Sequence, residues 1–403
     1  MTRELEQLLR DALRDHTADV GEPTAGFADV RSRARRASRL RRVGVAAAVV
    51  VVAVGVVVPL TLDRGRGRSG PLQLQEVALV TAPTSTPVSL ATLPPAATIT
   101  ATVPLGLTPE RSLIAGNDVW VFGTDAHGLP GVALVRVDER RVVVRRTLPH
   151  PVCSSSVSSG VLVAVVTLGT SCTNTLRALL PVDASTLVPG AIIGGADGGD
   201  VLVRDDAVYD TAGGQLERRD RPSLHVNAVL PLGGTDNSYV NMAADPSGSR
   251  LWVTILDRDR KRTKLVEVDL DAWKVLGTRP IDADNGGIPY AAGNEVWVGG
   301  ATGGISAVRH FDTALTPGTE VFAGGEDHAF FGWTGARLWQ FDGVYQEHGA
   351  LTCAAPDGTL LGSSPLPDPV PLAIMRADKH HIYLGVPGGH ALQILTATAA
   401  CAG

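Results

Sequence analysis

One strand signature recurs seven times in this 403-residue chain, and this repeat restricts the fold more than any other feature. Its markers are spaced by 42, 41, 49, 45, 42 and 44 residues, and they are Trp120, Leu162, Val203, Trp252, Trp297, Trp339 and Tyr383. A period of about 40 to 50 residues with several strands per unit is typical of a β-propeller blade. We therefore predict an all-β, seven-bladed β-propeller. A count of six to eight blades also fits, because the motif DDAVYDTAGG crowds the third marker.

Other architectures fit this part of the chain poorly. Apolar residues alternate with period two, which argues against a helical bundle. A β-helix would need repeats nearer about 20 residues, and a sandwich would not show seven copies in phase. With 44% apolar residues, the chain can bury a core of propeller size.

A second strand in each of four repeats closes on an aspartate, at Asp138, Asp183, Asp269 and Asp312. An Asp carboxylate can accept hydrogen bonds from backbone N–H groups two residues on, so we expect a turn at each of these positions. The four tryptophan markers recur once per repeat within a strand. We therefore expect them to pack between blades and not to stack on a ligand.

The last repeat is too short to supply four strands. The segments HHIYLGV and HALQILTATA leave room for at most three, and a strand-like segment at 97–103 precedes the first marker strand. We take the marker strands, including NDVWVFG and HHIYLGV, as the innermost strands of their blades. Pairing 97–103 with the last strand would remove two exposed edges. Both ends of the propeller are therefore predicted to share one blade.

Several segments resemble the YVTN-type propeller repeat, which is related to quinoprotein-like domains. They are ATITATVPLGLTPERSLIAGNDVWV at 97–121, ADPSGSRLWVTI at 244–255 and TKLVEVDLDAWKVLGTRPI at 263–281. The resemblance implies a fold more than an activity, because such propellers include enzymes and pure binding modules. The whole layout is similar to that of uncharacterised actinobacterial membrane proteins. Membrane-bound anti-sigma factors share it, but their zinc-type motif is absent from residues 1–42.

The 20 residues at 43–62 carry no charge. At about 1.5 Å per residue, such a helix spans roughly 30 Å, the thickness of a bilayer core, whereas strands rarely exceed about ten residues. We therefore predict one transmembrane helix. Seven arginines lie at 31–42 directly before it, against three at 64–68 directly after it, so we expect a cytoplasmic N-terminus and an extracytoplasmic propeller in the cell membrane. A cleaved signal peptide fits poorly, because a long segment precedes the apolar run and no A-x-A site follows it.

These observations divide the chain into four parts: a cytoplasmic segment at 1–42, the span at 43–62, a Pro/Thr-rich tether at 63–96 and the propeller at 97–403. Leucines at helical spacing in the first part predict an amphipathic helix. Two interpretations stay open for it: contact with the inner leaflet, aided by the Arg-rich flank, or docking of a cytoplasmic protein partner. The formal charge of −5 argues against a nucleic-acid partner.

All four cysteines follow the predicted span, in the compartment where disulfides persist. They are Cys153, Cys172, Cys353 and Cys401, and they allow three pairings. We expect Cys153 to pair with Cys172 across a short local loop, and Cys353 to pair with Cys401 and tie the C-terminal tail to the preceding repeat. The alternative is four unpaired buried thiols.

Known catalytic signatures are missing from the sequence. It has no G-x-S-x-G, no H-E-x-x-H and no P-loop lysine motif. The histidines that most deserve a test as metal ligands are His127, His310, His328, His380, His381 and His390. Only convergence in the folded ring would make them a site, so we predict no catalytic residue, metal or cofactor.

Two classes of function remain. The sequence favours a non-enzymatic binding module that is held at the membrane and recognises a ligand or a protein outside it. In that case the bound state could be relayed to a cytoplasmic partner of residues 1–42. The alternative is an exported propeller hydrolase or lactonase with a simple membrane anchor.

Overall fold

The computed structural model describes residues 93–402, apart from short stretches at 170–171, 173–176, 195–198, 213, 222, 235–237, 245–248, 258–261, 282–286, 293–294, 303–304, 323–327, 343–348 and 367–374. The predicted cytoplasmic segment, the predicted span and nearly all of the tether lie outside the described residues. Within the described ranges, no helix has the length and apolar character needed to cross a membrane.

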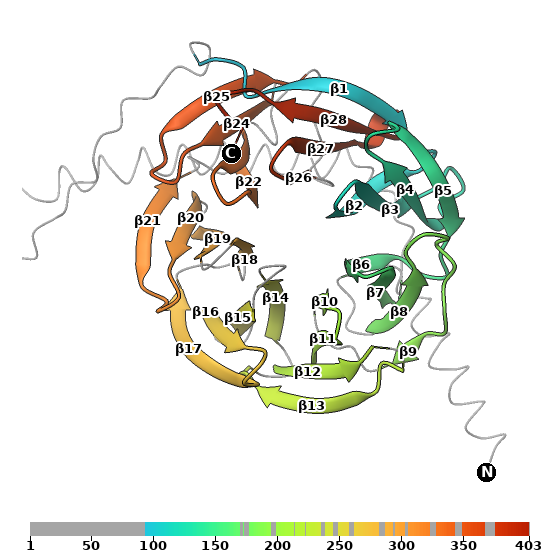
Figure 1. Cartoon of the computed structure of the whole chain (residues 1–403), viewed down its shortest axis with the longest axis vertical. Coiled ribbons are helices and arrows are strands. Elements are labelled where there is room, and N and C mark those ends of the chain that lie inside the picture. The colour runs from blue at the N-terminus through green and yellow to red at the C-terminus, as the bar shows by residue number, and fades with distance from the viewer. Residues whose placement is uncertain are drawn as a thin grey trace, which may run out of the picture. The chain divides into compact units, whose positions relative to one another are not determined.

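Seven four-stranded antiparallel sheets form a ring, so the prediction of a seven-bladed β-propeller is confirmed (Figure 1). We call the strands of each blade A to D from the centre outward. The first four blades consist of β2 (Thr108–Ala115), β3 (Asp118–Thr124), β4 (Pro130–Arg136) and β5 (Arg141–Thr147); β6 (Val152–Ser158), β7 (Val161–Thr167), β8 (Arg177–Asp183) and β9 (Ile193–Gly194); β10 (Val201–Val203), β11 (Ala207–Ala212), β12 (Gln215–Asp220) and β13 (Val226–Pro231); and β14 (Ser238–Ala244), β15 (Arg250–Asp257), β16 (Arg262–Asp269) and β17 (Lys274–Ile281).

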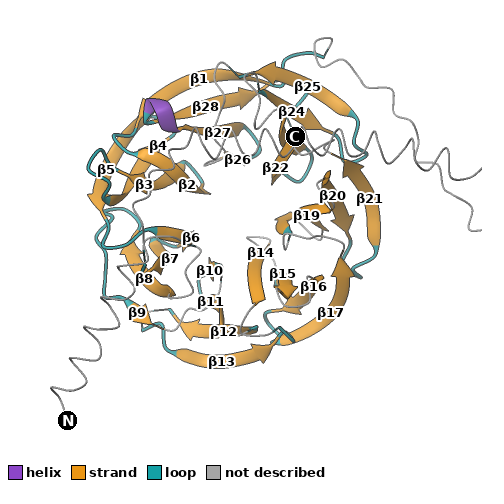
Figure 2. Ribbon diagram, turned by 180° about the vertical axis from the view of Figure 1, so that it is seen from behind, coloured by secondary structure: helices purple, strands orange, loops and turns teal. Residues whose placement is uncertain are grey.

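The last three blades follow the same order. They consist of β18 (Ile288–Ala292), β19 (Glu295–Thr302), β20 (Ile305–Phe311) and β21 (Pro317–Phe322); β22 (His328–Trp333), β23 (Leu338–Asp342), β24 (Ala350–Ala354) and β25 (Leu360–Pro365); and β26 (Met375–Ala377), β27 (His381–Val386), β28 (Ala391–Ala397) and β1 (Ala97–Pro104). In the described residues the single helical element is a short 3-10 turn, η2 (Pro387–Gly389), between β27 and β28 (Figure 2).

The marker strands are not the innermost ones, and this part of the prediction was wrong. Trp120 lies on β3 and Tyr383 lies on β27, each the second strand of its blade. The third marker, Val203, is on the innermost strand β10, so it is out of phase, and its true equivalent lies on β11. The second strand is buried on both faces, which gives it the strongest apolar signature, whereas the innermost strand β2 is half exposed.

Both ends of the propeller share blade 7, as predicted. β1 pairs antiparallel with β28 from Ala97 opposite Ala397 to Pro104 opposite Ala391. The hydroxyl of Ser364, at the end of β25, accepts hydrogen bonds from the N–H groups of Ala96 and Ala97 at 2.9 and 3.0 Å. The closing strand is therefore fixed both to its own blade and to the neighbouring one.

The core lies between consecutive blades. Trp120 packs with Leu162 and Leu180 of blade 2, and Trp297 lies 5.5 Å from Trp333 of blade 6, centroid to centroid. The equivalent Tyr383 closes the ring by packing on β3 of blade 1. These contacts confirm that the aromatic markers serve packing between blades, which is where the large buried side chains stabilise a propeller most.

The turns between strands C and D share an aspartate at the end of strand C and a buried leucine soon after it. The sequence pattern predicted only the aspartate. Asp183 Oδ1 accepts hydrogen bonds from the N–H groups of Ser185 and Thr186, and Asp312 does the same for Ala314 and Thr316. Three or four residues after the aspartate that ends strand C, a leucine takes the left-handed conformation and buries its side chain; these are Leu187, Leu224 and Leu315. The aspartate therefore fixes the turn while the leucine inserts between blades.

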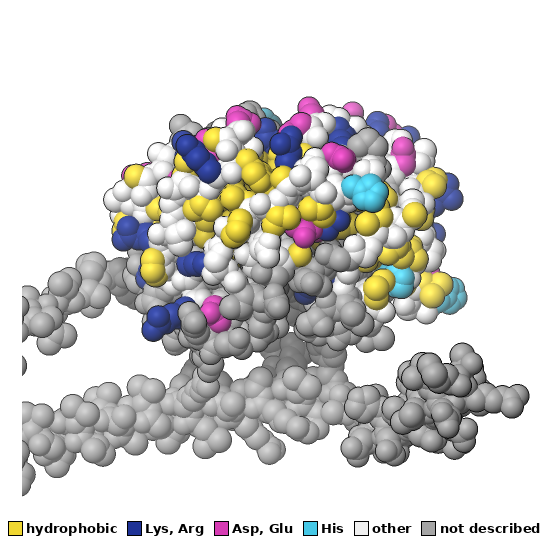
Figure 3. All heavy atoms as spheres, turned by 90° about the horizontal axis from the view of Figure 1, so that it is seen from below, with side chains coloured by type: hydrophobic (Ala, Val, Ile, Leu, Met, Phe, Trp, Pro, Cys, Tyr) yellow, Lys and Arg dark blue, Asp and Glu magenta, His cyan; other side chains and the backbone are white. Residues whose placement is uncertain are grey.

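Strand direction sorts the loops onto two faces. Because neighbouring strands are antiparallel, the A–B and C–D turns lie on one face of the ring, and the B–C turns and D–A connections lie on the other. We call these the AB–CD face and the BC–DA face. The outer strands form the rim, where Val226, Val229 and Leu276 are exposed. Figure 3 views the rim from the side of β13 and shows hydrophobic side chains over much of it.

Candidate functional site

Polar groups at the centre of the ring mostly join blades. Asp200, just before β10, accepts hydrogen bonds from the Ser154 hydroxyl of blade 2, from the N–H of Val201 at 3.0 Å and from the N–H of Met242 of blade 4 at 3.0 Å. The carbonyl of Gly287 accepts bonds from Asn241 and Thr254. These groups have structural partners already, so they offer little to a ligand.

Four of the candidate histidines lie on two opposite faces of the ring. His127 and His390 lie in B–C turns of blades 1 and 7, on the BC–DA face, while His380 and His381 lie at the A–B turn of blade 7, on the opposite face. The imidazole Nδ1 of His381 lies 3.7 Å from the carboxylate of Asp378 in the same turn, and that carboxylate accepts the backbone N–H groups of His380 and His381 at 2.7 Å. Within the described ranges, no cluster of three or more His, Cys, Asp or Glu side chains could hold a metal ion.

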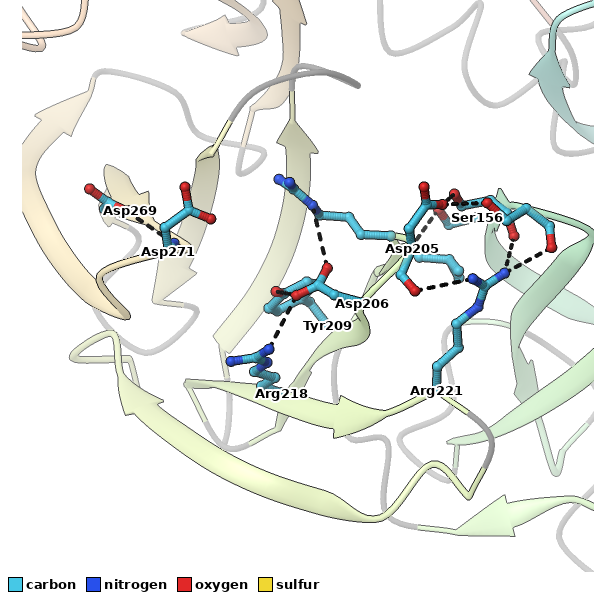
Figure 4. A network of polar contacts seen from close by, with 12 residues as sticks. Ser156, Asp205, Asp206, Tyr209, Arg218, Arg221, Asp269 and Asp271 are labelled. Atoms are coloured by element: carbon cyan, nitrogen blue, oxygen red, sulfur yellow. Dashed lines mark hydrogen bonds and ion pairs between the residues drawn. The ribbon is translucent and has the colours of Figure 1, made fainter.

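A dense polar network occupies the AB–CD face at blades 2 and 3 (Figure 4). The Asp205 carboxylate accepts the hydroxyls of Ser158 and Ser159, and Arg221 donates to the carbonyls of Ser158, Ser159 and Asp205. Beside it, Arg218 donates to Asp206 at 3.2 Å. Each charge in this network contacts an opposite charge, a hydroxyl or a carbonyl group. Because Asp205 and Arg221 of blade 3 bind Ser158 and Ser159 of blade 2, the network links the two blades.

A separate ion cluster is buried in blade 3, on β11 and β12. Arg219 donates to Asp210 at 2.7 Å, to Glu217 at 2.5 Å and to the carbonyl of Leu224 at 3.0 Å. Arg219 and Asp210 are 4% and 1% exposed. Burial raises the pKa of Asp210 to about 6, although the guanidinium of Arg219 acts in the opposite direction. This cluster is a structural element without access to a ligand.

A pocket of about 360 Å³ differs from both sites. It lies on the BC–DA face of blade 1, between the D–A connection, the B–C turn and the end of β5. The side chains that matter for its chemistry belong to Asp125, His127 and Arg145, and its apolar wall includes Leu107, Ala126 and Pro130. Its volume is at the lower end of the range for small-molecule sites, roughly 300 to 1,000 Å³.

Backbone groups hold both charges of this pocket. Asp125 Oδ1 accepts the N–H groups of His127 at 2.8 Å and Leu129 at 2.9 Å. The Leu129 N–H holds the pKa of Asp125 below its ordinary value, and the charges of His127 and Arg145 act in the same direction, so the carboxylate is ionised at neutral pH. Arg145 Nη1 donates to the carbonyls of Leu105 at 3.5 Å and Gly106 at 3.3 Å.

Gly106 is required for this position of the guanidinium. A Cβ atom on Gly106 would lie 1.8 Å from Arg145 Nη1, and its φ of +67° favours glycine. The next residue, Arg146, lines the pocket as well, but its Nε donates to the carbonyl of Thr186 in blade 2 at 3.3 Å. Neighbouring strand residues point to opposite sheet faces, so the pocket receives the guanidinium of Arg145.

The cysteines pair as expected. Cys153 and Cys172 have Cα atoms 5.3 Å apart within blade 2, and Cys353 and Cys401 have Cα atoms 6.0 Å apart, joining β24 to the C-terminal tail. All four cysteines are in disulfides. Sequence reasoning considered His127 only as a metal ligand and missed Asp125 and Arg145. The turn sequence Asp125-Ala-His-Gly was the available signal, since Asp and Gly favour tight turns.

The comparisons with known proteins concern the fold. No family model matches the sequence, and neither does any curated protein. A Kuenenia stuttgartiensis hydrazine synthase structure has a TM-score of 0.53 at 12% identity, covering 74% of this chain and 97% of that chain. The β-propeller domain of Myceliophteria thermophila Cps50 (Swd1) has a TM-score of 0.53 at 13% identity, covering 75% and 100%. The WD40 domain of Toxoplasma gondii coronin has 0.50 at 13%, covering 75% and 88%.

These likenesses place the chain among seven-bladed β-propellers and show the fold alone. The YVTN-type subclass, named from the repeat sequence, stays a prediction.

Proposed function

We propose that this protein is a binding module held at the membrane, with residues 1–42 inside the cell and the propeller outside. One observation carries the binding role: Asp125 and Arg145 line the same pocket, each fixed by backbone groups, and they make no ion pair with each other or with other described residues. At the junction of blades 2 and 3, by contrast, opposite charges are paired. Charges that are positioned but unpaired are suited to a ligand.

The membrane part of the proposal rests on the sequence. The uncharged segment at 43–62 has the length of a span, and the arginines before it favour a cytoplasmic N-terminus. The two disulfides lie on the side of the span where an oxidising compartment is expected. In this arrangement the Arg-rich flank contacts anionic lipid, and residues 1–42 offer a docking helix to a cytoplasmic protein that senses the state of the propeller.

Protease treatment of intact cells tests the topology. With an epitope tag at each end of the full chain, we expect the C-terminal tag to be lost and a small N-terminal fragment to survive. Survival of the whole chain in intact cells, with cleavage only after lysis, would contradict the orientation.

Site-specific photocrosslinking tests the binding role. Leu129, in the B–C turn beside the pocket, is 50% exposed and is the test position. Val226 on the rim is 42% exposed, so it serves as the matched control. A photoreactive residue at position 129 of the full-length protein in cells should give a mass adduct that position 226 does not give. Equal adducts, or none at either position, would argue against the pocket. The hydrolase alternative would instead predict turnover of ester or lactone substrates by the purified protein.

A further inference from the structure

We infer that the pocket of blade 1 binds a small zwitterion, a molecule with a carboxylate or phosphate group and an ammonium group, as in a free amino acid. This inference rests on the proposed function and names its ligand class. The pocket presents a fixed carboxylate, Asp125, and a fixed guanidinium, Arg145. A ligand with one charge would gain one partner and meet one repulsion, whereas a zwitterion gains both partners.

The Arg145 side would receive the anionic group. A guanidinium has five N–H donors in a planar fork, and the two carbonyl contacts of Arg145 use only its Nη1. The edge formed by Nε and Nη2 therefore suits a bidentate carboxylate or phosphate. His127 is exposed at the same pocket, in the turn that also holds Asp125.

The Asp125 side would receive the ammonium group. Its Oδ1 accepts both backbone N–H groups, so its Oδ2 makes no hydrogen bond to described residues. An ammonium group has three donors, and a carboxylate held by backbone N–H groups keeps its charge and its direction. Asp125 would repel a simple anion, which is why we assign a zwitterion instead of phosphate or a dicarboxylate.

Two features keep the Asp125 carboxylate and the Arg145 guanidinium from forming an ion pair with each other. Gly106 lets the guanidinium lie against the D–A connection, because any Cβ there would displace it. The B–C turn is closed at its other side by a hydrogen bond from the Asp125 N–H to the Leu129 carbonyl at 2.9 Å. Each charge is thus held by a separate segment of backbone, and the separation persists without a ligand.

Three matched probes test the inference on the full-length protein in a non-ionic detergent: glycine, acetate and methylammonium, each titrated by calorimetry. Glycine should bind at least about tenfold more tightly than either single-charge probe, because it makes both charge-assisted contacts. This ranking needs no variant. Glycine binding no more tightly than acetate would overturn the zwitterion assignment.

Two variants sharpen the test. Asp125→Asn should weaken glycine and methylammonium but not acetate, and Arg145→Gln should weaken glycine and acetate but not methylammonium, each by about tenfold. Asn can accept the same two N–H bonds, so the turn is retained, and the thermal midpoint checks this. Asp138→Asn and Arg141→Gln, which lie in blade 1 outside the pocket, are the matched controls. Equal loss of all three probes in both variants would contradict the charge roles.

A phospholipid headgroup with phosphate and ammonium groups shares this chemistry. Vesicles of phosphatidylethanolamine that compete with glycine, while phosphatidylglycerol vesicles do not, would support the zwitterion and identify the lipid as its source. If no probe binds while position 129 still gives its photocrosslinked adduct, the ligand class is wrong and the binding role stands. If both fail, the proposed function fails as well.

Discussion

Opposite charges lie near each other in two regions of this propeller, but they form ion pairs in only one of the two regions. In blade 3, Arg219 and Asp210 are buried and joined at 2.7 Å. In the pocket of blade 1, Asp125 and Arg145 face the same volume without pairing. A buried charge needs its partner, because a buried charge without one strongly destabilises the fold. A charge at the surface is solvated by water and can stay unpaired until a ligand binds. The same residue types therefore serve folding in one region and recognition in the other.

The largest expected effect is that of Arg219→Met. It leaves Asp210 buried without its partner and should lower the free energy of unfolding by about 3–5 kcal/mol, measured by denaturant titration. The double variant Asp210→Leu/Arg219→Met should recover most of this loss, because it removes both charges. Equal instability of the single and double variants would show that the pair does not act as a unit.

Loss of the Cys153–Cys172 disulfide should have the next largest effect. Its sequence separation of 19 residues corresponds to about 3 kcal/mol in the chain-entropy model. Cys153 is buried in the hydrophobic cluster that joins blades 2 and 3. The Cys153→Ser/Cys172→Ser variant should unfold at lower denaturant concentration. Unchanged binding of the three probes by this variant, once folded, would confirm that blade 1 functions separately.

The contributions of Asp210 and Asp125 to the free energy of unfolding should change with pH in opposite directions. The pKa of Asp210 is raised to about 6, so the folded state binds a proton more tightly than the unfolded state. Its contribution to stability is therefore lost as pH rises from about 4 to about 6. The pKa of Asp125 is lowered, so its contribution is present at higher pH and is lost as pH falls below about 4.

Stability curves of Asp210→Asn and Asp125→Asn against pH test this contrast. Relative to the wild type, Asp210→Asn should lack the decrease between pH 4 and 6, and Asp125→Asn should lack the decrease at more acidic pH. Parallel curves for all three proteins would contradict the assigned directions.

The smallest effect on folding is expected for Arg145→Gln. The side chain is exposed and, among the described residues, donates hydrogen bonds only to two carbonyls, so the free energy of unfolding should change by no more than about 0.5 kcal/mol. The same variant should bind glycine about tenfold more weakly. A large loss of stability in Arg145→Gln would remove the distinction between the two regions.

The sequence was sufficient to predict the seven blades, because each blade buries one strand on both faces and so repeats a strong apolar signature. The same signal misled the assignment of the innermost strand. Strand β2 reads Thr-Pro-Glu-Arg-Ser-Leu-Ile-Ala and is half exposed at the centre, so its polarity hides it beside Trp120 on β3. An apolar repeat in the sequence indicates which strand of each blade is most buried. In this propeller the most buried strand is the second strand, next to the innermost one.

The candidate site was out of reach of sequence reasoning. Asp125 and Arg145 meet only because β4 and β5 pair with Gly131 opposite Thr147, and because the D–A connection from blade 7 returns to the same place. Asp125 belongs only to a turn sequence and Arg145 to no motif, and the register shift between Leu134 and Val135 cannot be seen in one sequence. The disulfides were easier, since both pairs follow from loop length and compartment.

Crystals soaked with free selenomethionine would test the central claim most directly, because this amino acid is a zwitterion with an anomalously scattering atom. We predict an anomalous peak in the pocket of blade 1, with the ligand carboxylate on Arg145 and its ammonium on Asp125. A peak at blades 2 and 3, a reversed ligand, or no peak at a concentration that saturates glycine binding would contradict the account.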